Sequence, residues 1–573
     1  MTGQTEQIKK RINWGLFGLA VLLCLIKYGL IVSLPVEARG YNTDDLLMLR
    51  MARGFLYGEW LGNYDAVILM KGSFFPIFLA LTRIIGPSYL SVLTAINISA
   101  CSFFVFQMRN LVRNKRLLYV LFIVLLFDPC SFAQMTFQRV YRTSVMEMLV
   151  LFLFGSYFGL YLLVRQRRHS GDWSGLWREG ALGLVGGFAL WAIWNAREES
   201  MWVLPFVITG TILIVVELIG AIQEQKALHF SICTRFLCCI LPVLLLLGGN
   251  EWIRWENRRH YGASIRLEEV DGEFGRALKT IYSVKNKVEV PYATVSREKM
   301  ERLYAASESL RRIRPELEKQ LARYDNSDRG YRDGQVEDGW FFWALKYAAF
   351  ENGAAKTLPD SQAFWKQVRI ELEEAINKPE NELERQAVMP SALMSPWRGE
   401  YLAELPSVFW KEICYVISFE ETEPAIRASG KAQGSVCRFF EIFTNNMVVY
   451  PDQENELQNQ ILESVSSRLT FILRIYRTLN PVAALLGTGA FFALMFYSIK
   501  KKAKEHVPFI LIVAGMVLSS AVILCGTAYT HISAFYALRY PYMAGAYALT
   551  LASEWLGILY IVDRFLQKHS INR

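Results

Sequence analysis

This 573-residue chain lacks the short motifs that mark many soluble enzymes. It has no Walker motif, glycine-rich phosphate loop or GxSxG motif, which argues against ATP-driven chemistry and against a soluble nucleotide-sugar donor. The nine cysteines are scattered and form no CxxC pair, so a zinc-type centre is not predicted. No internal repeat or low-complexity tract is present.

The composition indicates a membrane protein with a sizeable aqueous part. Hydrophobic residues make up 53% of the chain and aromatic residues 14%, which is too apolar for a water-soluble protein. Charged residues still account for 20%, which is too many for a chain that lies wholly in lipid. We therefore expect membrane spans joined to at least one domain in water.

Apolar runs long enough to cross a bilayer, at about 20 residues each, occur along most of the chain. They lie near residues 14–36, 88–108, 117–130, 144–164, 179–197, 200–220, 230–249, 479–499, 507–528 and 541–563. The first has no Ala-x-Ala cleavage site and is interpreted as a retained signal anchor. The apolar piece 73–86 is shorter and contains Pro76, so we expect it to lie at the outer interface or to re-enter without crossing.

Basic residues predict how these spans are oriented. Lysine and arginine cluster between apolar runs, at 8–11, 109–116, 165–168, 500–504 and the C-terminal tail. With a cytoplasmic N-terminus, ten spans put every cluster on the cytoplasmic side, as the positive-inside rule requires. Nucleic-acid binding would need one contiguous basic face, so the lipid bilayer is a predicted partner and nucleic acid is not. We expect a multi-pass cell-membrane protein, most naturally of a bacterial plasma membrane.

The chain divides into three predicted parts. They are a transmembrane module at 1–250 with a first outer loop at 37–87, an extracytoplasmic and mainly helical domain at 251–475, and C-terminal transmembrane helices at 476–573. Within the domain, 297–324 and 359–377 have helical patterns. The aromatic stretch 339–350 predicts a buried helix, or else an acceptor-binding or membrane-facing surface. Cys414 and Cys437 could pair if the domain faces an oxidising compartment.

The first outer loop concentrates the residues of chemical interest. Two adjacent carboxylates, Asp44 and Asp45, precede a helical segment with Arg50 and Arg53, and Lys71 follows at the start of the next apolar piece. Sugar transfer from a lipid phosphate needs a base for the proton of the acceptor and cations for the charge that grows on the phosphate. Acid and cation beside lipid therefore indicate an enzyme that acts on a lipid phosphate.

A set of short pieces gives the chain a family resemblance. In order, they are Asp44-Asp45, Ala52-Arg53, Gly58-Glu59-Trp60, Lys71-Gly72 and, before the last span, Arg539-Tyr540. In these pieces the chain resembles the GT-C superfamily of integral-membrane glycosyltransferases, in particular lipid A aminoarabinose transferases and protein O-mannosyltransferases. The resemblance implies an all-α polytopic fold with about ten transmembrane helices. It also implies a polyprenyl-phosphate sugar donor and a cell-envelope glycan, lipid or protein as acceptor, with inversion at the anomeric carbon.

The chain departs from the family pattern at two points. Gly72 stands where the family has the proline of a Lys-Pro pair. Many relatives have a second acid in the loop after the third span, whereas here Asp128 ends that span and the loop 131–143 contains no acid. The sequence therefore gives no support for a divalent metal at a two-carboxylate site, and we predict no cofactor.

The resemblance also suggests roles for individual residues. Asp44 aligns with the first acid of the family and is predicted to be the catalytic base, while Asp45 could tune its pKa, position the acceptor or face solvent. Lys71 is predicted to bind the donor phosphate. The other predicted substrate-binding residues are Arg53, Arg142, Arg197, Glu198, Arg539 and Tyr540. The short turn 197–200 is either an ordinary polar turn or is drawn into the membrane protein, where ions usually have a function.

Other interpretations of the same residues stay open. Asp44 and Asp45 could cap the helix that follows them, and Lys71 could snorkel from an interfacial helix. A non-enzymatic transporter or flippase, or a polysaccharide polymerase acting on lipid pyrophosphate, could use the same cations. A transporter would place ionisable groups in mid-membrane, whereas the predicted spans are nearly free of charge and the polar residues gather at one face.

Overall fold

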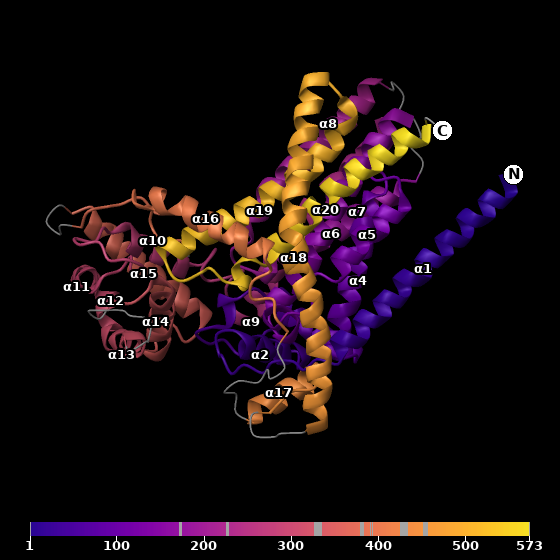
Figure 1. The fold of residues 1–573 in the computed structure, drawn as a ribbon. Helices are drawn as coiled ribbons and strands as arrows, with labels where there is room; N and C mark the ends of the chain where they lie inside the picture. Colours follow the sequence, from indigo (N-terminus) through magenta and orange to yellow (C-terminus); the bar gives the residue numbers. More distant parts are fainter. Residues whose placement is uncertain are drawn as a thin grey trace.

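Helices make up almost all the regular structure of this protein. The computed structural model describes residues 2–170, 175–224, 229–325, 335–378, 383–389, 391, 394–424, 434–450 and 456–571. Within these ranges the chain forms α-helices and short 3₁₀ or π segments, and its β-structure is limited to isolated bridges. The predicted all-α fold class is confirmed (Figure 1).

Eight of the described helices are long and apolar enough to cross a membrane. They are α1 (Thr2–Val32), α4 (Tyr89–Met108), α6 (Met146–Ser170), α8 (Leu204–Glu224), α9 (His229–Tyr261), α18 (Glu456–Lys501), α19 (Val507–Ser533) and α20 (Tyr540–Ile571). The protein is therefore a multi-pass membrane protein. At a rise of about 1.5 Å per residue, the 46-residue α18 also extends well beyond a bilayer.

The predicted span at 117–130 is interrupted by a break. Helix α5 (Lys115–Leu126) ends early, and the chain bends by 53° before the segment Pro129–Gln138. The cause is local, because Pro129 disfavours helical geometry at the residue before it, Asp128. The pair can be counted as a ninth span that is broken in the middle.

The predicted span at 179–197 corresponds to α7 (Trp177–Ala196), which is not among the eight helices that are apolar enough to cross a membrane. Its glycines lower the hydropathy but allow close packing between α6 and α9. A Cβ atom on Gly183 would lie 2.5 Å from the backbone oxygen of Cys238 in α9. Small residues at such contacts are typical of helices that pack inside membrane proteins.

Two short helices follow the first span. Both α2 (Asp45–Leu56) and α3 (Phe74–Ile85) have 12 residues, which is too few to cross a bilayer. The prediction that 73–86 does not cross is thus supported by its length. Figure 1 places α2 at the end of the bundle away from the two chain termini.

A separate helical domain lies at the left of Figure 1. It consists of α10 (Glu273–Ser283), α11 (Arg297–Ala306), α12 (Glu308–Arg312), α13 (Arg314–Asp325), α14 (Asp338–Glu351) and α15 (Leu358–Ile376). These helices share one core, in which Phe274 and Trp365 are fully buried. Helix α14 contributes most of its apolar residues to this core, as the prediction of a buried helix at 339–350 required.

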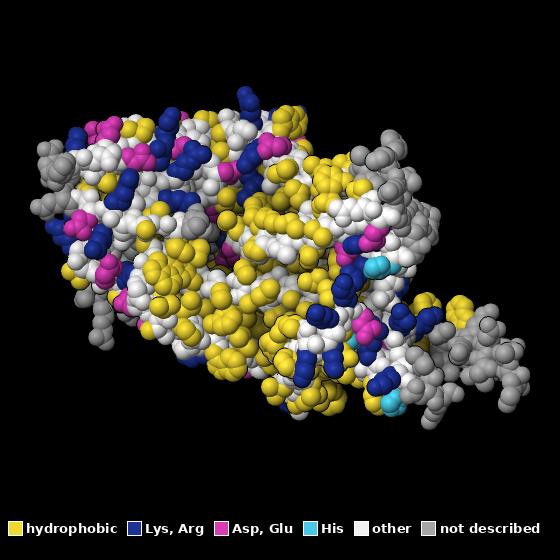
Figure 2. Space-filling view, turned by 90° about the horizontal axis from the view of Figure 1, so that it is seen from above, with side chains coloured by type: hydrophobic (Ala, Val, Ile, Leu, Met, Phe, Trp, Pro, Cys, Tyr) yellow, Lys and Arg dark blue, Asp and Glu magenta, His cyan; other side chains and the backbone are white. Residues whose placement is uncertain are grey.

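Two later helices of the 251–475 segment pack on the membrane helices instead. Val408 of α16 (Tyr401–Ile417) shares a small core with Tyr529 of α19, and Phe440 of α17 (Gly434–Thr444) belongs to the main bundle core. Cys414 is an exposed free thiol, so it does not form the proposed bond to Cys437. In Figure 2, charged side chains gather over the helical domain and hydrophobic ones over the membrane helices, with a hollow between the two regions.

A buried polar network fixes the helical domain to the loop at 37–87. The ammonium of Lys346 in α14 lies 2.5 Å from Glu268, which also accepts hydrogen bonds from Tyr64 of the loop at 2.8 Å and from Ser361 of α15 at 2.6 Å. The backbone N–H of Glu268 donates to the carbonyl of Leu69. These bonds place the start of the domain directly beside Lys71.

Candidate active site

Asp44 occupies the position before α2, but it does not cap that helix. Its side chain makes no capping bond and instead accepts a 2.9 Å hydrogen bond from the hydroxyl of Tyr141. The ammonium of Lys71 lies 3.8 Å away and the guanidinium of Arg139 lies 3.9 Å away. With 35% of its side chain exposed, Asp44 can still be reached by a substrate.

These contacts keep Asp44 ionised. Burial alone would raise the pKa of Asp44, but Lys71, Arg139, Arg142 and the hydrogen bond from Tyr141 together hold it below its ordinary value. Burial raises the pKa of Tyr141 to about 12, so its hydroxyl stays protonated and remains a donor. The result is a partly exposed carboxylate that is surrounded by cations.

Asp45 has a different role from its neighbour. Its carboxylate is fully buried and forms a two-pronged ion pair with Arg139, at 2.7 and 2.6 Å. The interpretation that Asp45 faces solvent is therefore wrong. The Arg139 guanidinium also stacks on the Tyr141 ring, with 4.2 Å to the ring centroid, so the Asp45 pair positions the group that donates to Asp44.

Lys71 points into the protein and not toward the lipid interface. Its ammonium lies near Asp44 and, at 5.4 Å from the ring centroid, against Trp343 of α14. Burial alone would lower the pKa of Lys71, but Tyr141, Glu198 and Asp44 raise it above its ordinary value. Lys71 is thus a fixed cation at the junction of the first loop and the helical domain, and the snorkelling interpretation is wrong.

Gly72 allows Lys71 to reach this place. A Cβ atom at position 72 would lie 2.0 Å from the backbone oxygen of Asn195 at the end of α7. Alanine would not fit there, and neither would the proline that the family pattern has. The departure from that pattern therefore has a structural reason.

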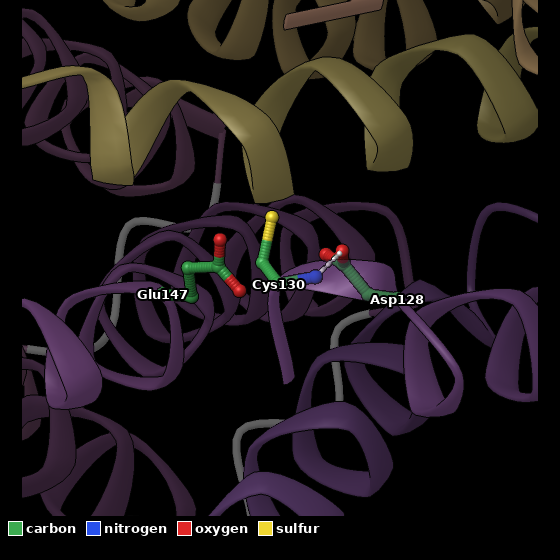
Figure 3. A group of neighbouring side chains, drawn as sticks. All are labelled: Asp128, Cys130 and Glu147. Atoms are coloured by element: carbon green, nitrogen blue, oxygen red, sulfur yellow. Dashed lines mark hydrogen bonds between the residues drawn. The ribbon is translucent and has the colours of Figure 1, made fainter. Parts of the chain in front are cut away.

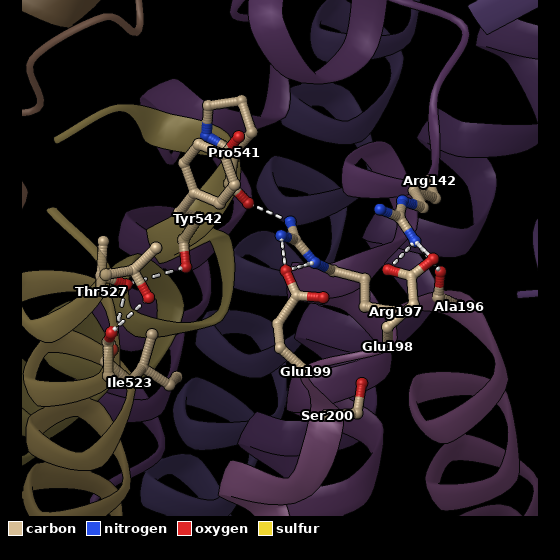
Figure 4. A network of polar contacts seen from close by, with 12 residues as sticks. Arg142, Ala196, Arg197, Glu198, Glu199, Ser200, Ile523, Thr527, Pro541 and Tyr542 are labelled. Atoms are coloured by element: carbon tan, nitrogen blue, oxygen red, sulfur yellow. Dashed lines mark hydrogen bonds and ion pairs between the residues drawn. The ribbon is translucent and has the colours of Figure 1, made fainter. Parts of the chain in front are cut away.

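The turn after α7 is drawn into the bundle and contributes ions to the same cluster (Figure 4). Arg142 forms a buried ion pair with Glu198, and it donates to the Ala196 carbonyl at 3.2 Å and to the Tyr141 hydroxyl at 3.1 Å. An ordinary polar turn would leave these charges in water. The structure thus joins two predicted residues, Arg142 and Glu198, to Asp44 through Tyr141.

Arg197 connects this turn to the last membrane helix. Its guanidinium pairs with Glu199, donates to the carbonyl of Pro541 and lies 5.8 Å from the ring centroid of Tyr542 (Figure 4). Burial would raise the pKa of Glu199, but Arg197 and Arg142 lower it far below its ordinary value. Helix α20 therefore meets the cluster through Pro541 and Tyr542.

Three predicted residues lie apart from the contacts around Asp44. Arg53 is exposed and lies over the ring of Phe439, and Arg539 is exposed beside Tyr536. Tyr540 is fully buried, and its hydroxyl donates a 2.7 Å hydrogen bond to Glu147 of α6. Their predicted binding roles are not tested by this geometry.

One group of three side chains in the described part of the chain could hold a metal ion: Asp128, Cys130 and Glu147 (Figure 3). Their potential ligand atoms lie within 4.8 Å of one another and are buried. Asp128 accepts a 3.0 Å hydrogen bond from the backbone of Cys130, and the ammonium of Lys27 lies 2.7 Å from Ser131 in the same region. The carboxylates of Asp128 and Glu147 already accept hydrogen bonds from protein donors, so a buried polar network accounts for this group of side chains.

Sequence reasoning missed several members of the Asp44 cluster. Arg139, Tyr141, Glu199 and Tyr542 are brought to it by tertiary packing. The sequence signals were the position of Arg139 and Tyr141 in a loop beside Arg142 and that of Glu199 in the turn 197–200. Glu269 was also missed, because an acid in a charged segment is expected to be solvated.

Comparison with known proteins adds no relative. No family model matches the chain, and neither a curated protein nor a solved structure does so. The fold and the site define a class of molecule only: a multi-pass helical membrane protein with a dense, partly accessible ion cluster where the bundle meets a helical domain.

Proposed function

We propose that this protein is a glycosyltransferase that moves a sugar from a polyprenyl-phosphate donor to a cell-envelope acceptor. The observation that supports this most is the 3.8 Å separation between the carboxylate of Asp44 and the ammonium of Lys71. The two groups come from opposite ends of the first outer loop. Their meeting satisfies the requirement for a base and a phosphate-binding cation in one place.

In the proposed reaction, an acceptor hydroxyl attacks the anomeric carbon of the donor. Its proton passes to Asp44, the new glycosidic bond forms, and the bond between the anomeric carbon and the phosphate oxygen breaks. The electron pair of that bond stays on the polyprenyl phosphate, whose extra charge Lys71 stabilises, with Arg142 and Arg197 nearby. A single displacement of this kind inverts the anomeric centre.

The surroundings of the site fit a lipid donor. Apolar helices lie beside the cluster, so a polyprenyl chain could stay in the bilayer while its phosphate reaches Lys71. We place the site on the extracytoplasmic side, because the basic residues of 165–168 lie at the far end of α6 from Arg142. The acceptor would then be a glycan, lipid or protein outside the cytoplasm.

The competing proposal is a transporter or flippase for a lipid phosphate. It is favoured by one observation that contradicts the expectation of nearly charge-free spans: Lys27, Asp128 and Glu147 are buried among the membrane helices. Buried ionisable groups are typical of transport paths. The enzyme proposal is favoured because the cluster around Asp44 is more accessible than the buried group of Lys27, Asp128 and Glu147.

Reconstitution distinguishes the two proposals. Full-length protein in proteoliposomes with polyprenyl-phosphate sugars should consume the donor and release polyprenyl phosphate. Asp44→Asn should lower the rate of donor consumption by at least about 10²-fold while lipid binding persists. Glu59→Gln, which changes an exposed acid in the same loop, should behave as wild type. Equal turnover in wild type and Asp44→Asn would exclude the base role, and transbilayer movement without donor consumption would favour the transporter.

A further inference from the structure

Glu269 is a buried acid that the proposed reaction does not use. It is the third residue after Arg266 in the segment that leads from α9 into the helical domain, and only 5% of it is exposed. Its Oε1 atom is buried and has no hydrogen-bond partner in the described structure. Buried carboxyl oxygens without a partner are uncommon in proteins and cost stability, so this one calls for an explanation.

The groups around Glu269 are those of the candidate active site. Lys71 and Arg142 act on it as cations, and Glu198 and Glu199 act on it as anions. Burial, reinforced by Glu198, holds the pKa of Glu269 well above its ordinary value despite the two cations. The environments of Asp44 and Glu269 thus shift the pKa values of the two carboxyls in opposite directions. This pattern occurs where two acids have separate roles in one site.

The backbone holds Glu269 in this place. Glu268 is locked by Lys346 and by its backbone bond to Leu69. On the other side, a Cβ atom on Gly275 would lie 2.1 Å from the carbonyl oxygen of Glu269, so the start of α10 packs against this residue without a gap. The docking of the helical domain therefore fixes the buried Glu269 between the start of α10 and the loop segment that leads from Leu69 to Lys71.

We propose that Glu269 is a substrate-binding residue, supplied by the helical domain, that forms a hydrogen bond with a hydroxyl of the sugar on the lipid phosphate. This inference rests on the proposed function. A hydroxyl fits because it can both donate and accept, so it pairs with the carboxyl in either protonation state. A metal cation fits poorly, because Lys71 and Arg142 would repel it.

The proposal assigns the helical domain a role in recognising the sugar. The phosphate would be held by cations from the membrane module, and the sugar would be read by a residue from the domain. Loss of Glu269 should then weaken binding of the sugar-bearing lipid without affecting the sugar-free lipid. A residue with only a structural role would affect both lipids or neither.

Binding titrations with full-length protein in nanodiscs test this separation. The probes are sugar-free polyprenyl phosphate and the same lipid linked to glucose, mannose, galactose or N-acetylglucosamine. Wild type should bind at least one sugar-bearing lipid more tightly than the sugar-free lipid. Glu269→Leu should lose that preference, by about tenfold or more, with unchanged affinity for the sugar-free lipid, and Glu269→Gln should retain most of it.

The outcomes separate this inference from the proposed function. If wild type binds no polyprenyl phosphate, the proposed function fails. If wild type binds the sugar-free lipid and every sugar-bearing lipid equally, or if Glu269→Leu keeps the wild-type preference, then the inference about Glu269 fails while lipid-phosphate binding stands. Thermal melting of both variants shows that they are folded, and Glu59→Gln serves as an exposed control in the first loop.

Discussion

The hydroxyl of Tyr141 donates a 2.9 Å hydrogen bond to the carboxylate of Asp44, across 97 residues of sequence. The bond takes the Asp44 side chain away from the N-terminus of α2, where it would otherwise act as a cap. It also couples Asp44 to Arg142, which donates to the same hydroxyl at 3.1 Å. Tyr141 is therefore the residue through which Arg142, and with it Glu198 of the turn after α7, acts on Asp44.

The pH profile of donor turnover should report this coupling. Because the pKa of Asp44 is lowered, Asp44 stays ionised until the pH falls below its ordinary value of about 4, so the acidic limb should begin only below that pH. Tyr141→Phe removes a hydrogen bond to the charged form, which raises the pKa of Asp44 and moves the acidic limb to higher pH. The measurement is kcat/KM for donor consumption between pH 3 and 8, approximately the accessible range.

The matched control is Tyr57→Phe, which removes an exposed hydroxyl from the same loop. Its profile should overlay that of wild type. An acidic limb in Tyr141→Phe at the wild-type position, or at lower pH, would contradict the coupling.

Lys71→Ala should weaken binding of polyprenyl phosphate by about 10- to 100-fold, because a buried cation that contacts an anionic group contributes about 1.5–3 kcal/mol. Arg83→Ala removes an exposed cation from the last turn of α3, so its effect should stay within about fivefold. Dissociation constants for the sugar-free lipid provide the comparison. If both variants bind as tightly as wild type, another group holds the phosphate.

Gly72→Ala should displace the loop that holds Lys71. The new Cβ atom would lie 2.0 Å from a backbone oxygen of Asn195, and neither main chain can move without disturbing the end of α7. We expect a lower melting temperature together with lipid affinity close to that of Lys71→Ala. Gly40→Ala is the control, because a Cβ atom there meets nothing within 4 Å. Wild-type stability and binding in Gly72→Ala would show that the loop has more room than its packing indicates.

Much of the fold follows from local sequence signals. Long apolar runs determined the membrane helices, and helical periodicity with a proline near the start located α15, which Thr357 caps by accepting from Asp360. Two differences between the predicted and the observed helices also have local causes. The break before Pro129 was hidden inside an apolar run, and the helical stretch 297–324 is divided at Ser307, which caps α12.

Less of the site than of the fold could be predicted from the sequence. Asp44 and Lys71 were found because each lies in a short polar stretch between apolar runs. The burial of Asp45 was not predictable, since it depends on Arg139 from a loop after the third apolar run. Glu269 was hidden for a related reason: nothing in a charged segment reveals that the backbone bond from its neighbour to Leu69 turns it inward.

Asp45→Asn should destabilise the protein strongly. The change removes the buried counter-charge that contacts the Arg139 guanidinium and leaves only the more distant Asp44 at 3.9 Å; loss of one partner of a buried pair typically costs about 3–5 kcal/mol. The double variant Asp45→Asn/Arg139→Gln removes both charges and should recover part of the lost thermal stability. Glu301→Gln, which breaks an exposed ion pair with Arg314, should change stability by about 1 kcal/mol at most. If Asp45→Asn melts like wild type but has lost turnover, Asp45 acts in the chemistry and not in positioning Arg139.

Glu269→Gln should stabilise the unliganded protein, and more so as the pH rises. The folded protein holds the proton of Glu269 more tightly than the unfolded chain does, because the pKa in the fold is raised above the ordinary value of about 4.3. Between these two pKa values the folded state binds more protons, so wild-type stability falls as the pH increases. Glutamine has no proton to lose, and the difference in melting temperature between Glu269→Gln and wild type should therefore grow from pH 5 to pH 8, roughly the window above the unfolded pKa. Glu59→Gln, an exposed change of the same kind, should show no such trend. A constant difference across this range would mean that Glu269 is ionised throughout and that Lys71 and Arg142 already neutralise it.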